Sequence, residues 1–196
     1  MTDNNLQPGF DNPVLDSQYL FRQLLNAFSH PGMIEQLDES VHRAPVNKAC
    51  YAICLTMVDY ETPLWLDEAA MANDKLVDFF KFHCGSPLVT KTSEASFALV
   101  ITPGELPPLA EFNQGEVAFP DRSATLIVQV SSLETGSGWC LSGPGIKDHA
   151  RLQVVGLPER FLSDWQDNHA VFPLGVDLIL TCDTSFAALP RTTIIQ

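Results

Sequence analysis

One cation and two hydroxyls stand together near the end of the sequence, where a strand-like apolar run gives way to Arg191, Thr192 and Thr193. A guanidinium makes two parallel hydrogen bonds to a phosphate or a carboxylate, and hydroxyls add further donors. The same arginine could instead pair with a carboxylate of its own chain such as Asp177, which the turn-forming segment 172–175 would place nearby. The pattern therefore leaves three roles open for Arg191: an anion site, an anchor between subunits, or a structural ion pair.

A second candidate is the turn at Gly143 and Gly145 in the stretch LSGPGIKD, because glycines after a strand let backbone amides approach an anion. The known nucleotide fingerprints do not fit this stretch. Asp148 stands where a dinucleotide motif needs its third glycine, and the Gly-Lys pair of a P-loop does not occur in the chain. A tight turn is the simpler interpretation, and an anion-binding turn is the alternative.

His83 and Arg22 complete the set of candidate ligand-binding or interface residues. His83 follows Leu76, Phe79 and Phe80 at helical spacing, so it joins the apolar stripe of an expected helix. Such a residue is typical of the protein core, although a histidine beside a cleft would also suit proton transfer. Arg22 is a cation on the first expected helix, where it could bind a ligand or a partner.

Metal-binding and hydrolytic motifs are not found in the sequence. The histidines are dispersed, and no His-Glu-x-x-His helix or Gly-x-Ser-x-Gly elbow occurs. The cysteines number five and include no Cys-x-x-Cys pair, so reduced and buried thiols are expected. We therefore predict no metal site, and the residues themselves assign no catalytic group.

The elements that would position these residues alternate between helix and strand. Apolar periodicity and capping residues predict helices over 16–29, 47–59, 74–84 and 158–170, the first with Asp16 as its N-cap and Phe21, Leu24, Leu25 and Phe28 on one stripe. Short apolar runs predict strands over 33–37, 97–101, 124–130, 139–143, 152–156, 177–182 and 187–195. The order predicts a tail over 1–15 and a single layered α/β domain over 16–196, with a mixed β-sheet covered by helices.

Length and charge narrow the class of protein further. A chain of 196 residues, 45% hydrophobic, is long enough for one well-packed domain. Asp and Glu number 24 against 11 Lys and Arg, and a net charge of −13 repels nucleic-acid backbones and anionic membranes. The N-terminus has no basic region followed by an apolar run, so a cytoplasmic protein without nucleic-acid or membrane partners is expected.

Several stretches, taken in order, resemble one known family. They are FRQLLNAFSHPG (21–32), ETPLWL (61–66), KFHCGSPLV (81–89), ATLIVQV (124–130), SGPGI (142–146), FPLGVDLILTC (172–182) and LPRTT (189–193). Together they resemble the H subunits of the bacterial carbon-phosphorus lyase complex, over nearly the whole chain. Each stretch is short, but their common order makes the resemblance specific.

The resemblance implies an accessory subunit in phosphonate catabolism, which supports the formation of a ribose 1-phosphonate 5-triphosphate from a phosphonate and ATP. It implies G, I and J subunits as partners, a homodimer when the chain is isolated, and a fold like the large domain of pyridoxal-phosphate-dependent transferases. No cofactor is expected here, because none of Lys48, Lys75, Lys81, Lys91 and Lys147 lies in a recognisable Schiff-base motif.

Two further expectations rest on the residues. The helix over 47–59 is apolar almost all round, which favours a homodimer that covers it. The alternative to an accessory subunit is a self-sufficient small-molecule enzyme, whose phosphate or carboxylate pocket would combine Arg191, Thr192, His83 and the turn at Gly143 and Gly145.

Overall fold

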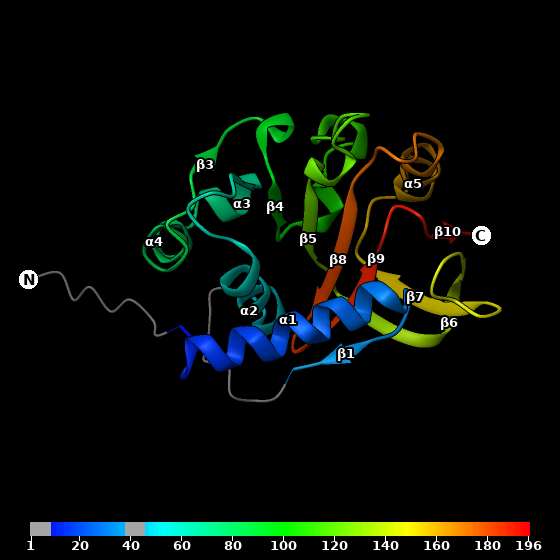
Figure 1. The fold of residues 1–196 in the computed structure, drawn as a ribbon, viewed down its shortest axis with the longest axis horizontal. Helices are drawn as coiled ribbons and strands as arrows, with labels where there is room; N and C mark the ends of the chain where they lie inside the picture. Colours follow the sequence, from blue (N-terminus) through cyan, green and yellow to red (C-terminus); the bar gives the residue numbers. More distant parts are fainter. Residues whose placement is uncertain (1–8, 38–45) are drawn as a thin grey trace, which may run out of the picture.

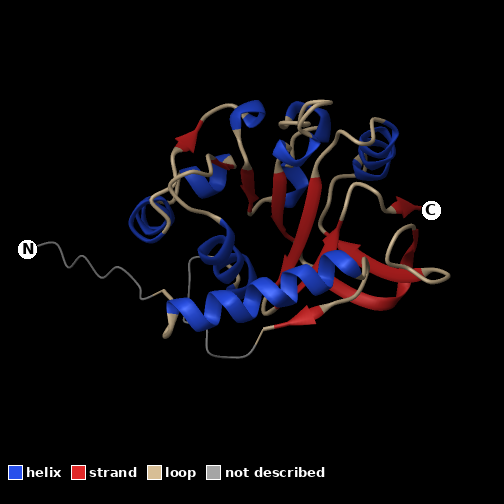
Figure 2. Ribbon diagram, in the orientation of Figure 1, coloured by secondary structure: helices blue, strands red, loops and turns tan. Residues whose placement is uncertain are grey.

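The computed structural model describes residues 9–37 and 46–196, which form two sheets with helices packed around them (Figures 1 and 2). The helices are α1 (Pro13–Ser29), α2 (Lys48–Met57), α3 (Glu68–Met71), α4 (Asp74–His83) and α5 (Phe161–Ala170), with short 3-10 helices η1 (Thr92–Glu94), η2 (Pro103–Glu105), η3 (Leu109–Glu111) and η4 (Pro120–Arg122). The strands are β1 (Glu35–Gln36), β2 (Leu64–Leu66), β3 (Leu88–Val89), β4 (Phe97–Val100), β5 (Thr125–Gln129), β6 (Ser132–Ser142), β7 (Ala150–Val155), β8 (Asp177–Cys182), β9 (Ser185–Leu189) and β10 (Ile194–Ile195). The mixed α/β architecture agrees with the sequence prediction.

The large sheet is seven-stranded, in the order β1-β9-β8-β5-β4-β2-β3, and the small sheet has the order β10-β6-β7. Strands β3, β2, β4, β5 and β8 run parallel, whereas β9 returns antiparallel beside β8 and pairs with β1. The last residue of β9, Leu189, lies opposite Leu178 near the start of β8. The chain that follows β9 therefore begins at the amino ends of the parallel strands.

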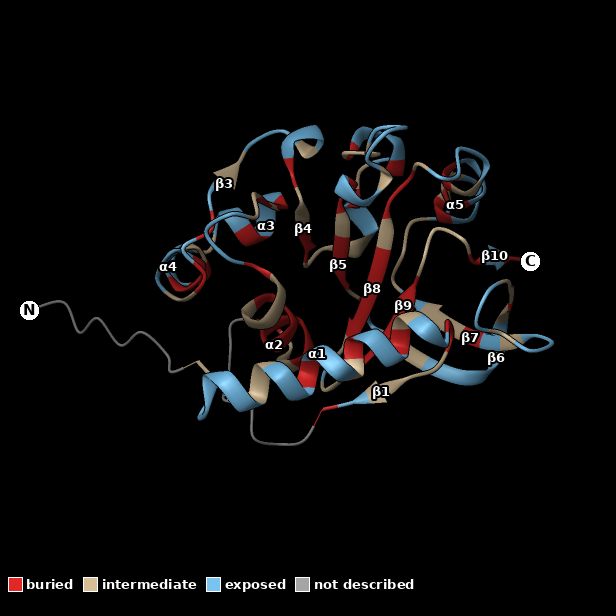
Figure 3. Cartoon of the chain, in the orientation of Figure 1, coloured by how far each residue is buried: buried red, intermediate tan, exposed pale blue. Residues whose placement is uncertain are grey.

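Both faces of the large sheet are covered, because its central strands send alternate side chains into two cores. Ile127 and Ile179 join a core with α1, α2 and α4. Leu126 and Leu178 join a second core that contains α5 and parts of β6 and β7. These four side chains are fully buried. Most of β5 and β8 is coloured as buried in Figure 3. The apolar run over 124–130 is therefore covered on both faces.

Helix α1 differs from its prediction at its start and on its buried face. Asn12, not Asp16, is the N-cap: its side chain accepts a hydrogen bond from the N–H of Leu15, and Asp16 accepts one from the N–H of Asn12. Helix α1 thus begins within the expected tail. Phe21 and Leu25 are 44% and 53% exposed, while the buried residues of α1 are Leu20, Leu24 and Ala27. Each successive residue is turned by about 100°, so a shift of one position moves a side chain off the packed face.

Other elements agree in kind and differ in extent. The last expected strand, 187–195, is divided at Pro190, so that β9 belongs to the large sheet and β10 to the small one. Strand β6 is longer than the run over 139–143, and β2 and β3 were not predicted at all. Helix α2 begins after its N-cap Asn47, whose side chain accepts a hydrogen bond from the N–H of Cys50. Within the described ranges, the helices are too short or too polar to span a bilayer.

Candidate functional site

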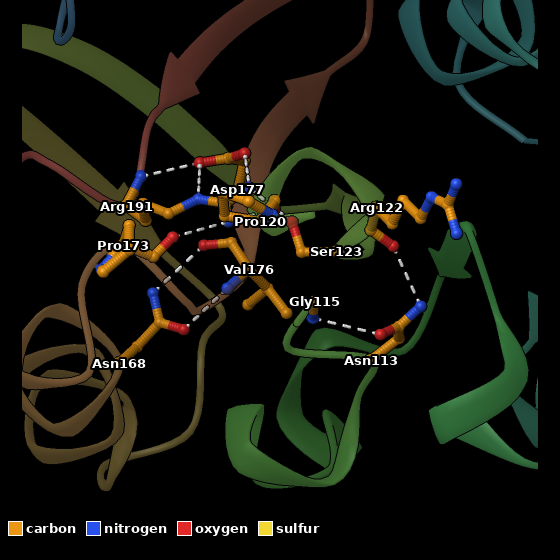
Figure 4. A network of polar contacts seen from close by, with 10 residues as sticks. All are labelled: Asn113, Gly115, Pro120, Arg122, Ser123, Asn168, Pro173, Val176, Asp177 and Arg191. Atoms are coloured by element: carbon orange, nitrogen blue, oxygen red, sulfur yellow. Dashed lines mark hydrogen bonds and ion pairs between the residues drawn. The ribbon is translucent and has the colours of Figure 1, made fainter. Parts of the chain in front are cut away.

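Arg191 lies in a dense network of polar contacts (Figure 4). Its Nε donates to Asp177 Oδ1 at 3.1 Å, and its Nη2 donates to Asp177 Oδ2 and to Ser123 Oγ. Nη1 donates to the carbonyl oxygens of Pro120 and Pro173, at 3.0 and 3.3 Å. The backbone N–H of Arg191 adds a 2.7 Å bond to Asp177 Oδ1. A guanidinium has five N–H groups, and each of these therefore has a protein partner.

The location of this network also favours a structural role. The side chains of Arg191 and Asp177 are only 11% and 20% exposed. Asp177 is the first residue of β8, so the pair lies at the amino ends of the parallel strands. Ligands of open α/β sheets bind at the opposite, carboxyl ends. Of the three roles open for Arg191, the geometry supports the structural ion pair, because no N–H group is left for an anion or a partner chain.

Thr192 and Thr193 pack the C-terminal segment against neighbouring loops. Thr193 is 1% exposed, and its carbonyl accepts a 2.9 Å hydrogen bond from Trp165 Nε1. Its hydroxyl is enclosed and has no hydrogen-bond partner among the described residues. A Cβ added at Gly143 would lie 2.8 Å from the carbonyl oxygen of Thr192. The space beside Gly143 is therefore occupied by backbone of the same chain.

Gly145 likewise meets backbone of the same chain. The N–H of Ile146 donates to the carbonyl oxygen of Gly143 at 3.1 Å, which closes a tight turn. Gly145 has a φ of +83°, and a Cβ there would overlap the carbonyl oxygen of Ser29 at the end of α1. The tight-turn interpretation describes what the structure shows, and the turn brings the sequence stretches SGPGI and SHPG into contact.

His83 and Arg22 lie away from Arg191. His83 ends α4, near the β3 edge of the large sheet, whereas Arg191 follows β9 (Figure 1). The His83 ring contacts the rings of Phe79 and Phe82, with centroid distances of 4.4 and 4.9 Å. Arg22 is exposed on α1. The structure thus joins Arg191 to Asp177 and Gly143 to Thr192, and it does not assemble all the candidates into one pocket.

The thiols are poorly suited to nucleophilic chemistry where they are buried. Burial raises the pKa of Cys84 to about 12, and the neighbouring carboxylate of Asp59 acts in the same direction. The pKa of Cys54 is also raised, first by its hydrogen bond with Cys50 and then by burial. A thiol with a raised pKa forms little thiolate, which is the reactive species. In residues 9–37 and 46–196, no three His, Cys, Asp or Glu side chains lie together as metal ligands would.

A hollow of about 520 Å³ opens between the end of α1 and the small sheet; we refer to it as the α1–β7 hollow. Of the earlier candidates, it includes only Gly145. The sequence signal that could have revealed it is the cluster of Lys147, His149 and Arg151, three basic residues within five positions of an acidic chain. The lining residues are His30, Pro31, Gly32, Met33, Thr135, Gly136, Gly145, Ile146, Lys147, His149, Ala150 and Arg151.

The fold and these sites define a mixed α/β protein with a clamped ion pair and a basic hollow beside its small sheet. A family model described as bacterial phosphonate metabolism protein (PhnH) matches residues 8–196, so the chain belongs to the PhnH family. It is 37% identical to the α-D-ribose 1-methylphosphonate 5-triphosphate synthase subunit PhnH of Rhizobium meliloti (strain 1021), over 95% of this chain and 94% of that protein.

A second relative extends this likeness. The chain is 32% identical to a Stutzerimonas stutzeri protein named as a candidate C-P lyase subunit, HtxG, over 91% of this chain and 85% of that protein. The family expected from the sequence is therefore confirmed.

Proposed function

We propose that this chain is an accessory subunit of a carbon-phosphorus lyase assembly, in which it supports the formation of a ribose 1-phosphonate 5-triphosphate from a phosphonate and ATP. The observation that carries the proposal is the likeness over 95% of the chain to a subunit whose name states that product. The network around Arg191 is consistent with it, because all five guanidinium N–H groups of the strongest anion-binding candidate in the sequence are bonded within the fold.

A deletion strain tests this proposal. Removal of the gene is expected to abolish growth with methylphosphonate as the phosphorus source, while growth with phosphate continues. A plasmid copy of the gene should restore growth, which separates loss of the subunit from damage to neighbouring genes. Normal growth of the deletion strain on methylphosphonate would overturn the proposal.

The proposed partners are the G, I and J subunits, in the cytoplasm. Tagged chain is expected to co-purify with all three when the four are produced together. The chain alone is expected to release no adenine from ATP and methylphosphonate, whereas addition of partner subunits should allow release. Release by the chain alone would instead favour the self-sufficient enzyme, although its suggested residues Arg191 and His83 lie on different parts of the molecule (Figure 1).

We also propose that the isolated chain forms a homodimer, but on a different surface from the one that the sequence suggests. Helix α2 is covered by its own chain, since Ala49 through Cys54 are buried. The exposed apolar side chains are on α1 instead: Val14 is 77%, Phe21 44% and Leu25 53% exposed. They lie at i, i+7 and i+11, which is one stripe of a helix, beside the exposed Arg22. A stripe of this kind favours contact with another chain.

Light scattering at micromolar concentration tests the dimer. The wild-type mass is expected to be twice the 21.6 kDa of the chain. The double variant Phe21→Ser with Leu25→Ser should be monomeric. Leu162→Ser is the control, because Leu162 is an exposed apolar residue, 41% accessible, on α5. A monomeric wild type, or a dimer that survives the double change, would contradict this surface.

The relation of the large sheet to the large domain of pyridoxal-phosphate-dependent transferases stays a prediction, and with it the expectation that this chain uses no such cofactor. When pyridoxal phosphate is added to the purified chain, the visible absorbance spectrum should show no Schiff-base band stronger than the band given by the unfolded chain, in which the lysines are exposed.

A further inference from the structure

The α1–β7 hollow is basic in an acidic chain. Lys and Arg number only 11 among 196 residues, against 24 Asp and Glu. Lys147 and Arg151 nevertheless both line the hollow, together with His30 and His149, and its lining residues include no carboxylate. Asp148 is exposed between Lys147 and His149 in sequence but does not line the hollow. The local charge is therefore opposite to that of the whole molecule.

The basic side chains that line the hollow make few hydrogen bonds with the protein itself. Neither the Lys147 nor the His149 side chain makes a hydrogen bond or ion pair within the described part of the chain. Arg151 makes one long contact, from Nη1 to the carbonyl oxygen of Gly138 at 3.3 Å. His30 Nδ1 lies 3.0 Å from the carbonyl oxygen of Asn26. A carbonyl can only accept, so Nδ1 carries the hydrogen there, and Nε2 donates to a phosphate oxygen only in a ring that carries a second hydrogen.

The backbone around the hollow is held in place by two glycines with positive φ. Gly32 has a φ of +86°, and a Cβ there would lie 2.7 Å from Leu141 Cδ1 and 3.2 Å from the Ala150 side chain. Gly145 packs against Ser29 in the same way. These approaches fix the end of α1 against β6 and β7, as the arrangement of these elements shows (Figure 1). The basic side chains are thus carried on backbone that is locked to the rest of the fold.

We propose that the α1–β7 hollow binds the phosphate chain of a small polyphosphate-bearing molecule. The Lys147 ammonium, the Arg151 guanidinium with its single long protein contact, and the His149 imidazole are donors that suit phosphate oxygens. A volume of about 520 Å³ is far larger than one phosphate needs, and it lies within the range of about 300–1,000 Å³ typical of small-molecule sites. A triphosphate presents several anionic groups, which several basic side chains around one hollow can contact together. The link to the 5-triphosphate product rests on the proposed function; the anion site rests on the hollow itself.

Calorimetric titration of the isolated chain with tripolyphosphate is the direct test. Wild type is expected to bind, and binding should weaken as salt is added, because exposed charges are screened. The double change Lys147→Gln with Arg151→Gln is expected to weaken binding tenfold or more, since two charged hydrogen-bond donors are lost. Lys75→Gln with Lys81→Gln is the matched control: it removes the same charge from exposed positions on α4, outside the hollow.

Three ligands distinguish what the hollow recognises. Similar affinity for ATP and tripolyphosphate would mean that the phosphate chain alone is bound, and tighter binding of ATP would add the nucleoside; both support the proposal. The proposal would be overturned if adenosine were the only one of the three ligands to bind, or if tripolyphosphate did not bind. It would also be overturned if both double variants weakened binding equally.

Growth separates this inference from the proposed function. If the wild-type chain binds no tripolyphosphate but the deletion strain still fails on methylphosphonate, the anion site is wrong and the accessory role stands. If the chain binds tripolyphosphate and the deletion strain grows normally, the accessory role fails while the anion site stands.

Discussion

Two cationic regions of this acidic chain differ in how many of their hydrogen-bond donors have partners within the protein. Arg191 is 11% exposed and gives every guanidinium N–H to Asp177, Ser123 and two backbone carbonyls. Lys147, at the α1–β7 hollow, is exposed and has no protein partner in the described ranges. The comparison shows that a cation with all its donors satisfied by the chain holds the structure together, while one without partners is available to a ligand.

Loss of the Arg191 side chain is expected to have the largest effect. Arg191→Ala leaves the largely buried Asp177 without its counter-charge and removes the hydrogen bonds from the guanidinium to Ser123 and to the carbonyl oxygens of Pro120 and Pro173. Breaking such a pair is expected to lower the free energy of unfolding by roughly 3 kcal/mol, toward the low end for buried pairs because Asp177 is 20% exposed. Urea unfolding followed by circular dichroism measures this change.

Two further substitutions make the Arg191 test specific. Arg191→Lys should recover only part of the loss, because an ammonium cannot reproduce the five-donor fork. Arg122→Ala is the control: Arg122 is exposed, and its guanidinium lies over the Phe119 ring at 4.1 Å. Its removal should cost less than about 1 kcal/mol. If Arg191→Ala costs no more than Arg122→Ala, the ion pair is not a structural clamp.

The next effect tests the backbone that supports the hollow. Gly145→Ala places a methyl group against the Ser29 carbonyl at a φ of +83°, and should cost about 2 kcal/mol from left-handed strain and overpacking together. Gly136→Ala is matched in φ, +89°, but its Cβ meets nothing within 4 Å. It should cost only the strain, about 1 kcal/mol. Thermal unfolding compares the two, and equal losses would mean that the contact with Ser29 is unimportant.

How much of this could be predicted from sequence differs between the two regions. The pairing of Arg191 with Asp177 was one of three interpretations of the sequence, because each of these residues stands out in its own local pattern. The choice needed the return of β9 beside β8, which places Leu189 opposite Leu178 and so brings Arg191 to the start of β8. This pairing is itself local, because Cys182 lies opposite Ser185 across a two-residue turn. What periodicity does not contain is the approach of Pro120 and Ser123, which are 71 and 68 residues from Arg191 in sequence and accept hydrogen bonds from its guanidinium.

The hollow was harder to predict, because its parts are about a hundred residues apart. His30 follows α1, whereas Lys147, His149 and Arg151 lie between β6 and β7 or within β7. A cluster of basic residues in the sequence does not show which other part of the chain will lie beside it. The fold class was predictable, since long apolar runs such as 124–130 are unambiguous. Strand β2, with only three residues, was too short to give a period.

A smaller effect is expected from a single partner of Arg191. Ser123 is 8% exposed, and its hydroxyl accepts from Arg191 Nη2. Ser123→Ala should lower the free energy of unfolding by about 1–2 kcal/mol, because one N–H of a charged group then lacks its acceptor. Ser163→Ala is the control, since the exposed Ser163 hydroxyl donates to the carbonyl oxygen of Arg160. An equal, negligible change in both variants would indicate that water replaces Ser123 at no cost.

The smallest effect on stability is expected at the hollow itself, in contrast to the effect expected at Arg191. Lys147 and Arg151 are both exposed, and between them they make one 3.3 Å contact with protein, so Lys147→Gln with Arg151→Gln removes little that holds the fold together. Exposed substitutions of this kind usually change the free energy of unfolding by less than about 0.5 kcal/mol. Urea unfolding of this variant and of Lys75→Gln with Lys81→Gln should therefore give the same midpoint within error. A loss approaching that of Arg191→Ala would show that these cations too are structural, because a residue kept for a ligand should matter when the ligand binds and not when the chain folds.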